Sequence, residues 1–140
     1  MFAMVMYVPA RHMGGGMKKK VVETAHATLC EGFGVERSEV KVLLECVEDT
    51  ECNARVLDVY FPILYIPKNT PYEAKKRTGK LLYDRLLALY PNGEMKNVYL
   101  HIKEHDLSNY ALNGKSAAFD KDLKKRIETM QENLTGGQGK

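Results

Sequence analysis

The feature that most constrains the fold of this sequence is one order of elements, strand then helix then strand, that occurs twice. A shift of 58 residues places Val40 on Val98, and each helix is long enough to connect two parallel strands. The sequence therefore predicts two β-α-β units in tandem. The predicted elements are Met4–Val8, Met17–Phe33 and Glu39–Glu48 in the first unit, and Val56–Ile66, Tyr72–Tyr90 and Asn97–Glu104 in the second.

The ends of both helices carry residues that favour helix termini. Gly32 and Gly34 are predicted to end the first helix, since glycine adopts the left-handed conformation that closes many helices. Thr70 is predicted to be the N-cap of the second helix, with Pro71 in its first turn. Pro91 follows the second helix and is expected to stop it.

The strand at Val56–Ile66 is apolar on both of its faces, which indicates how the sheet is covered. Two helices on one side of a four-stranded sheet require only that side to be apolar. Because the second side is apolar too, we expect this open side to be covered by self-association. The predicted fold class is α/β (α+β): a tandem β-α-β repeat with a four-stranded sheet and two helices on one face.

A further amphipathic helix is predicted after the second unit. The predicted organisation is a domain at 1–115, with units at 1–54 and 55–115, then this C-terminal helix at 116–134 and a disordered tail at 135–140. The apolar stripe of the helix consists of Phe119, Leu123, Ile127, Met130 and Leu134.

Composition excludes several classes of protein. The chain has 140 residues, 44% of them hydrophobic and 28% charged, which fits one globular domain and not a disordered chain. The net charge of +3 is small and the signs are interspersed, so neither a nucleic-acid nor a membrane partner is predicted. Three cysteines without metal-ligand spacing favour free thiols, no metal, no cofactor and a reducing, cytoplasmic location.

Two sets of segments in the chain resemble the tautomerase superfamily. The run Tyr72–Tyr83, followed by Val98–Glu104, is similar to the 5-carboxymethyl-2-hydroxymuconate isomerases. The opening Met1–Pro9, together with Val98–His101 and the later Asn113–Phe119, resembles the proteins like macrophage migration inhibitory factor. This resemblance implies two β-α-β units in each subunit of a homotrimer.

The resemblance also implies a chemistry, from which this sequence departs at its start. Members of that superfamily use an amino-terminal proline as general base, whereas this sequence begins Met1-Phe2 and its Pro9 is internal. Methionine removal requires a small second residue, so Met1 is expected to remain. Its α-amine has an ordinary pKa of about 7.7–8.0 and is the predicted catalytic base.

The resemblance and the residue types together indicate the other site residues. Tyr99 matches a pocket tyrosine, and His101 lies on the same strand face, so both are predicted to polarise the substrate oxygen. Alternatively, the two side chains only pack at a subunit interface. Arg11, Lys41 and Lys68 are predicted to hold a substrate carboxylate, against the alternative of ordinary surface charges.

Two functions follow from these predictions. The first is keto–enol isomerisation of a small acidic keto compound by a homotrimer, with atypical or lost activity because the proline is absent. The second is a non-catalytic trimeric binding module of the same fold, in which the C-terminal helix recruits a partner. The missing proline favours the second function, whereas Tyr99, His101 and the cationic residues favour the first.

Overall fold

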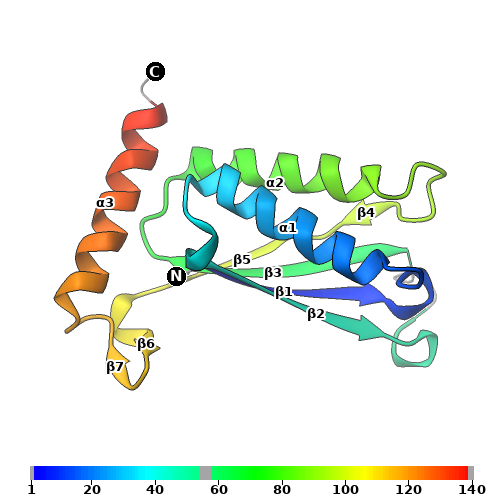
Figure 1. The fold of residues 1–140 in the computed structure, drawn as a ribbon, viewed down its shortest axis with the longest axis horizontal. Coiled ribbons are helices and arrows are strands. Elements are labelled where there is room, and N and C mark those ends of the chain that lie inside the picture. The colour runs from blue at the N-terminus through cyan, green and yellow to red at the C-terminus, as the bar shows by residue number, and fades with distance from the viewer. Residues whose placement is uncertain (1, 54–57, 139–140) are drawn as a thin grey trace.

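A computed structural model describes residues 2–53 and 58–138 of the chain. Its main elements follow the predicted order of strand, helix and strand, twice, with a small hairpin and a third helix after them (Figure 1). The bounds are β1 Phe2–Pro9, α1 Met17–Phe33, β2 Val40–Val47, β3 Val59–Pro67, α2 Tyr72–Ala88, β4 Asn97–Val98, β5 His101–His105, β6 Ala111–Leu112, β7 Lys115–Ser116 and α3 Lys121–Gln138.

The main sheet joins the two units through its two central strands. Its order is β2-β1-β3, and β4 and β5 both pair with the remaining edge of β3. Within each unit the strands are parallel, as a crossover helix requires, whereas β1 and β3 are antiparallel. The two helices lie side by side on one face of this sheet (Figure 1). The predicted mixed α/β fold is therefore confirmed.

The face under the helices, here called the covered face, holds the core. Alternate residues of β1, beginning with Phe2 and Met4, have side chains at most 1% exposed. The ring of Phe2 stacks on that of Phe33 at the end of α1, with centroids 4.7 Å apart. Burial of each such side chain stabilises the fold by about 1.5–3 kcal/mol. The covered face is thus a continuous apolar layer between strands and helices.

The two helices lie in close contact at Gly32. A Cβ atom at this position would lie 2.8 Å from Thr78 Cβ and still closer to its hydroxyl oxygen, so the α1–α2 contact admits no side chain there. Arg77 of α2 donates a hydrogen bond of 2.5 Å to the carbonyl of Gly32. Gly34 then ends α1 in the left-handed conformation, with φ of 64°. The prediction that these glycines end the first helix is confirmed for Gly34, whereas Gly32 lies within the helix.

The opposite face of the sheet, here called the open face, carries the alternate residues of the same strands. Register places Val5 between Leu43 of β2 and Ile63 of β3, with His101 of β5 beyond Ile63. No described helix covers this face (Figure 1). Leu43 is 63% exposed as a result. The open face is therefore apolar in its centre, as the composition of the strands predicted.

Two details of the second unit differ from the sequence prediction. The predicted strand Asn97–Glu104 is divided into β4 and β5, although the Tyr99 amide still bonds to the Tyr60 carbonyl at 2.9 Å. Thr70 is not the N-cap of α2. Its hydroxyl donates instead to the Pro67 carbonyl at 2.7 Å, and Pro71 occupies the N-cap position. The alternation of apolar and polar residues does not show where the hydrogen bonds between strands are interrupted. Nor does the sequence show which carbonyl accepts the hydrogen bond of a threonine hydroxyl.

The third helix begins and ends later than predicted. It spans 121–138 rather than 116–134. It starts later because Asp120 Oδ1 accepts a hydrogen bond from the Leu123 amide and caps its first turn. Phe119 lies before the helix and is 89% exposed, so it does not belong to the apolar stripe. Residues 135–138 are helical, contrary to the predicted tail. The remaining stripe residues are buried, namely Leu123, Ile127, Met130 and Leu134.

A short hairpin occupies the chain that was predicted to start the helix. β6 and β7 pair antiparallel around Asn113 and Gly114, which have φ of 53° and 81°. An Asn-Gly pair with two positive φ angles is the usual connection of a tight hairpin. The sequence thus contained a turn signal at this position, and it explains why Ser116 lies in a strand.

Helix α3 is attached at the end of the sheet where β5 finishes (Figure 1). Arg126 Nη1 lies 3.0 Å from Glu39 Oε1, and Gln131 Nε2 donates to the Lys68 carbonyl at 2.7 Å. These contacts join the helix to both β-α-β units. In the described residues, no helix is long and apolar enough to cross a membrane.

Candidate functional site

Two pairs of side chains lie where β3 and β5 end, beside the start of β1. Lys68 pairs with Asp106, and His105 stacks on Tyr110, and we call these four residues the start corner. Register places Ala3 beside Tyr65, which lies two residues before the end of β3. Pro67 then pairs with His105, and the Lys68 amide donates to the His105 carbonyl at 2.8 Å. The antiparallel β1–β3 pairing therefore brings the first strand to this group.

His105 is the half-buried titratable group of the start corner. Its ring stacks on that of Tyr110, with centroids 5.4 Å apart and planes 23° from parallel. Burial lowers the pKa of His105 below its ordinary value of 6.5, because the charged imidazolium loses hydration. The imidazole is consequently neutral at pH 7 and able to accept a proton. His105 continues the alternation of Tyr99, His101 and Lys103, a signal that the predicted strand missed by ending at Glu104.

Lys68 provides a cation at the start corner. Its ammonium lies 3.4 Å from Asp106 Oδ1, and both side chains are more than half exposed. Such surface pairs contribute about 0–1 kcal/mol, so an anionic ligand competes for the ammonium at little cost. The contact from Gln131 of α3 fixes the backbone of Lys68. Lys68 is therefore available to bind a carboxylate, and this role stays a prediction.

Arg11 lies at the opposite end of the sheet and is already paired. Its guanidinium bonds to the Asp58 carboxylate, and His12 Nε2 lies 3.0 Å from the same oxygen. The hydrogen bond from His12 is the largest cause of the lowered pKa of Asp58. Desolvation opposes it, and the hydrogen bond and charge of Arg11 lower the pKa further. The structure thus separates Arg11 from Lys68, and the two residues do not form one site within a subunit.

Tyr99 and His101 lie beside Phe61 on the open face. The His101 ring stacks on that of Phe61 with centroids 5.0 Å apart, and the Tyr99 ring lies 6.3 Å away. At about 3.3 Å per residue, His101 is roughly 13 Å and Tyr99 roughly 20 Å along the chain from His105. The structure thus places Tyr99 and His101 near each other, and far from the start corner of the same subunit.

The remaining predicted residues are Lys41 and Met1. Lys41 is exposed on β2 and pairs in register with Ala3, so β1 separates it from β3. With strands about 4.8 Å apart, its backbone lies roughly 10 Å from that of Tyr65. Met1 lies outside the described residues, and the residue after it, Phe2, is fully buried. Lys41, on β2, and Lys68, directly after β3, thus lie near the same end of the sheet with β1 between their strands.

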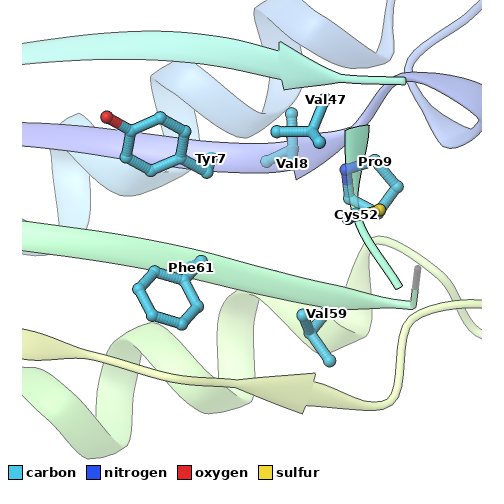
Figure 2. A pocket seen from close by; sticks show the side chains of 7 residues that line it. All are labelled: Tyr7, Val8, Pro9, Val47, Cys52, Val59 and Phe61. Atoms are coloured by element: carbon cyan, nitrogen blue, oxygen red, sulfur yellow. The ribbon is translucent and has the colours of Figure 1, made fainter. Parts of the chain in front are cut away.

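An apolar pocket of about 310 Å³ lies on the open face, at the end where β1 and β2 finish. Figure 2 shows it from the side opposite the helices, with the rings of Tyr7 and Phe61 on neighbouring strands. None of its lining residues is charged. The lining consists of Tyr7, Val8, Pro9, Val47, Cys52, Val59 and Phe61. The pocket could not be predicted from the sequence, because its residues come from three strands and a loop.

Comparison with known proteins identifies the fold through structure alone. No protein-family model matches the sequence, and no curated protein matches it. In residues 2–53 and 58–138, no three His, Cys, Asp or Glu side chains are grouped to hold a metal ion.

Several solved structures are similar over most of the chain. The crystal structure of native fused 4-OT has a TM-score of 0.72 and 14% identity, and covers 83% of this chain and 96% of that one. A fused 4-OT described as an asymmetric trimer has a TM-score of 0.66 and 16% identity over 83% and 96%. N1, a member of the cis-3-chloroacrylic acid dehalogenase family, has a TM-score of 0.69 and 11% identity over 96% and 99%.

These similar structures are members of the tautomerase superfamily, so the resemblance seen in the sequence is confirmed for the fold. TM-scores of 0.66–0.72 establish the shared architecture, whereas identities of 11–16% carry no site residue from one chain to another.

Proposed function

We propose that this protein is a keto–enol isomerase of small acidic keto compounds that acts as a homotrimer, with its site at the start corner. The observation that carries the proposal is the backbone hydrogen bond from Lys68, a weakly paired cation, to His105, a half-buried imidazole whose pKa is lowered by burial. Isomerisation needs a base that takes a proton beside a carbonyl and a group that binds the acid. The start corner supplies both kinds of group.

The proton transfer has two candidate bases. Burial lowers the pKa of His105 and so favours the uncharged imidazole, which is the form that can take a proton from a substrate. The α-amine of Met1, predicted from the resemblance, stays the other candidate. Tyr110, which stacks on His105, places a phenol group at the same corner. Lys68 would hold the substrate carboxylate once Asp106 releases it.

Self-association is the second part of the proposal. The exposed apolar side chains of the open face, such as Leu43, support it, because water contact of this face is unfavourable. The asymmetric trimer of fused 4-OT, with the same fold, supports three copies. A neighbouring copy would also be needed to bring Tyr99 and His101 to a start corner, since each lies far from it within a subunit.

A non-catalytic trimeric binding module is the second candidate. The separation of Tyr99 and His101 from the start corner favours it, as does the pairing of Arg11 with Asp58. In this alternative the cationic groups bind an acidic ligand without turning it over. The two candidates differ in turnover, and both predict binding.

The experiment compares turnover of phenylpyruvate and of a 2-hydroxymuconate by the parent protein and by matched variants. His105→Gln should lower kcat by about 10²-fold or more, while His12→Gln, beside Asp58 at the opposite end of the sheet, serves as its control. Lys68→Met should raise KM, whereas Lys76→Met, an exposed lysine of α2, should not. Acetylation of the α-amine tests Met1 separately, because an acetylated nitrogen is not basic.

The outcomes separate the candidates. Loss of turnover in His105→Gln with retained binding supports the isomerase at the start corner. Loss of turnover after acetylation of the α-amine, with turnover retained in His105→Gln, assigns the base to Met1. Parent protein that binds phenylpyruvate without turning it over overturns the isomerase and supports the binding module. A monomeric mass by light scattering at micromolar concentration contradicts the trimer.

A further inference from the structure

Phe119 is exposed to an extent that is unusual for a phenylalanine. Its side chain is 89% exposed, more than that of any other large apolar residue described. It lies between β7 and α3, where its amide bonds to the Ser116 carbonyl at 3.1 Å and fixes the backbone. Leu112 of the same segment is 42% exposed. A ring on a hydrogen-bonded backbone is held out from the surface, which suits insertion into a partner.

The pocket between β1, β2 and β3 has the properties that such a ring requires. It is about 310 Å³ and lined by apolar side chains, with the rings of Tyr7 and Phe61 on one side (Figure 2). A cavity of about 150 Å³ accommodates a benzene molecule, so this pocket has room for one phenyl ring and part of a second side chain. Aromatic rings also attract one another in edge or offset contacts, beyond the gain from burial alone.

The two features cannot meet within one subunit. Phe119 follows the hairpin at the end of the sheet where β5 finishes, whereas the pocket lies at the other end, where β1 and β2 finish (Figure 1). A contact between them therefore joins two copies through different surfaces. Head-to-tail contacts of this kind form closed rings when the rotation between copies closes.

Charges beside the two features are complementary. Register places Glu45 next to Tyr7 at the edge of the pocket, and Lys115 lies in β7 near Phe119. Both are charged side chains at the surface, and neither takes part in an ion pair among the described residues. When Phe119 of one copy enters the pocket of another, this carboxylate and this ammonium approach one another.

We propose that Phe119 of one copy of this chain inserts into the apolar pocket of the next copy, with Lys115 facing Glu45, and that this contact holds the assembly. The inference rests on the self-association in the proposed function and adds which surfaces meet. It assigns no role in proton transfer, so the start corner is tested independently of it.

The experiment uses Cys52, which lines the pocket and is free. In full-length Phe119→Cys protein, mild oxidation or a short bis-maleimide should join the introduced thiol to Cys52 of another copy. The product is a covalent dimer or trimer on a denaturing gel. Phe119→Cys combined with Cys52→Ser should lose that product. Lys124→Cys, an exposed position on α3, should not form it, which controls for random collision.

A second measurement needs no cysteine. Phe119→Ala leaves the fold of the subunit intact, because the side chain contacts little of it, and should raise the dissociation constant of the assembly by about tenfold or more. Glu45→Lys should weaken assembly, and Lys115→Glu in the same chain should restore it. Circular dichroism confirms that each variant is folded.

Each outcome decides the inference. Cys52-dependent cross-linking together with weaker assembly of Phe119→Ala supports it. An assembled parent without such a cross-link, and with Phe119→Ala assembling normally, overturns it while the trimer stands. A monomeric parent overturns both the inference and the assembly, whereas turnover of phenylpyruvate then still reports on the start corner.

Discussion

The two faces of the main sheet are built by alternate residues of the same strands, and their surroundings differ completely. On β3, Leu64 points to the covered face and is fully buried, whereas its neighbour Ile63 belongs to the open face and is only partly buried. Both are large aliphatic residues. The difference shows that apolar character in a strand of this chain has two uses, one within the subunit and one toward a partner.

The covered face is therefore expected to determine the stability of the subunit, and the open face its association. A closed layer of side chains loses both burial and packing when one is truncated, while a partly exposed side chain loses only a part of its burial. Stability and association should thus respond to different residues of one strand. Paired substitutions on the two faces test this separation.

Leu64→Ala should lower the free energy of unfolding by about 2–5 kcal/mol, because it leaves a cavity under the helices. Ile63→Ala on the next residue should cost about 1 kcal/mol or less in dilute protein, where no second copy covers it. Urea unfolding at fixed low protein concentration measures both. Equal losses for the two variants would contradict the separation between the faces.

Gly32→Ala should destabilise the protein by about 1–3 kcal/mol, because the new Cβ would overlap the side chain of Thr78 and force the helices apart. Gly79→Ala is the matched control on α2, where a Cβ would lie 3.6 Å from Leu100. The control should be neutral or stabilise by up to about 1 kcal/mol, since alanine favours helix. Melting temperatures compare them, and two similar values would disprove the close contact.

The smallest expected effect is the contribution of His105 to the pH dependence of folding stability. Its pKa in the folded protein lies below the ordinary 6.5, so the unfolded chain binds the proton more readily. This contribution to stability is complete above about pH 6.5 and is lost as the pH falls from there toward the lowered pKa. His105→Gln should reduce the dependence of stability on pH in that range.

His101→Gln is the control for this prediction, because His101 lies on the same strand and its side chain is exposed. Urea unfolding of parent and variants from about pH 7 to pH 5, on either side of the ordinary histidine pKa, gives the comparison. A parent whose stability does not fall over this range more than that of His105→Gln would show that burial does not perturb this histidine.

Much of the fold could be predicted from the sequence because it follows from local pattern. Helical spacing identified α1 at the bounds observed, and two-sided apolar strands indicated an open face. The predicted start of α3 was wrong, because the helical spacing of the apolar Phe119 was given more weight than the turn signal of Asn113 and Gly114. The helical spacing of apolar residues does not distinguish a residue that is buried within the subunit from one that is exposed and can contact another copy.

The candidate site was less predictable, since it depends on pairings between distant residues. Arg11 is engaged by Asp58, 47 positions along the chain, so its availability was not visible in the sequence. His105 was missed although it continues the alternation of the strand, because the ring partner Tyr110 lies beyond the strand end. Residue type suggested the chemistry, and only the tertiary arrangement selected Lys68 and His105.

The antiparallel pairing of β1 with β3 has a consequence for the order of folding. In both units, parallel partners such as Phe2 and Val40, or Ile63 and His101, are 38 residues apart, whereas Ala3 and Tyr65 are 62 residues apart. Nearer contacts close smaller loops and form first, so each unit is expected to be structured before the two dock. A chain cut between the units would then yield two fragments that recombine through this central pair.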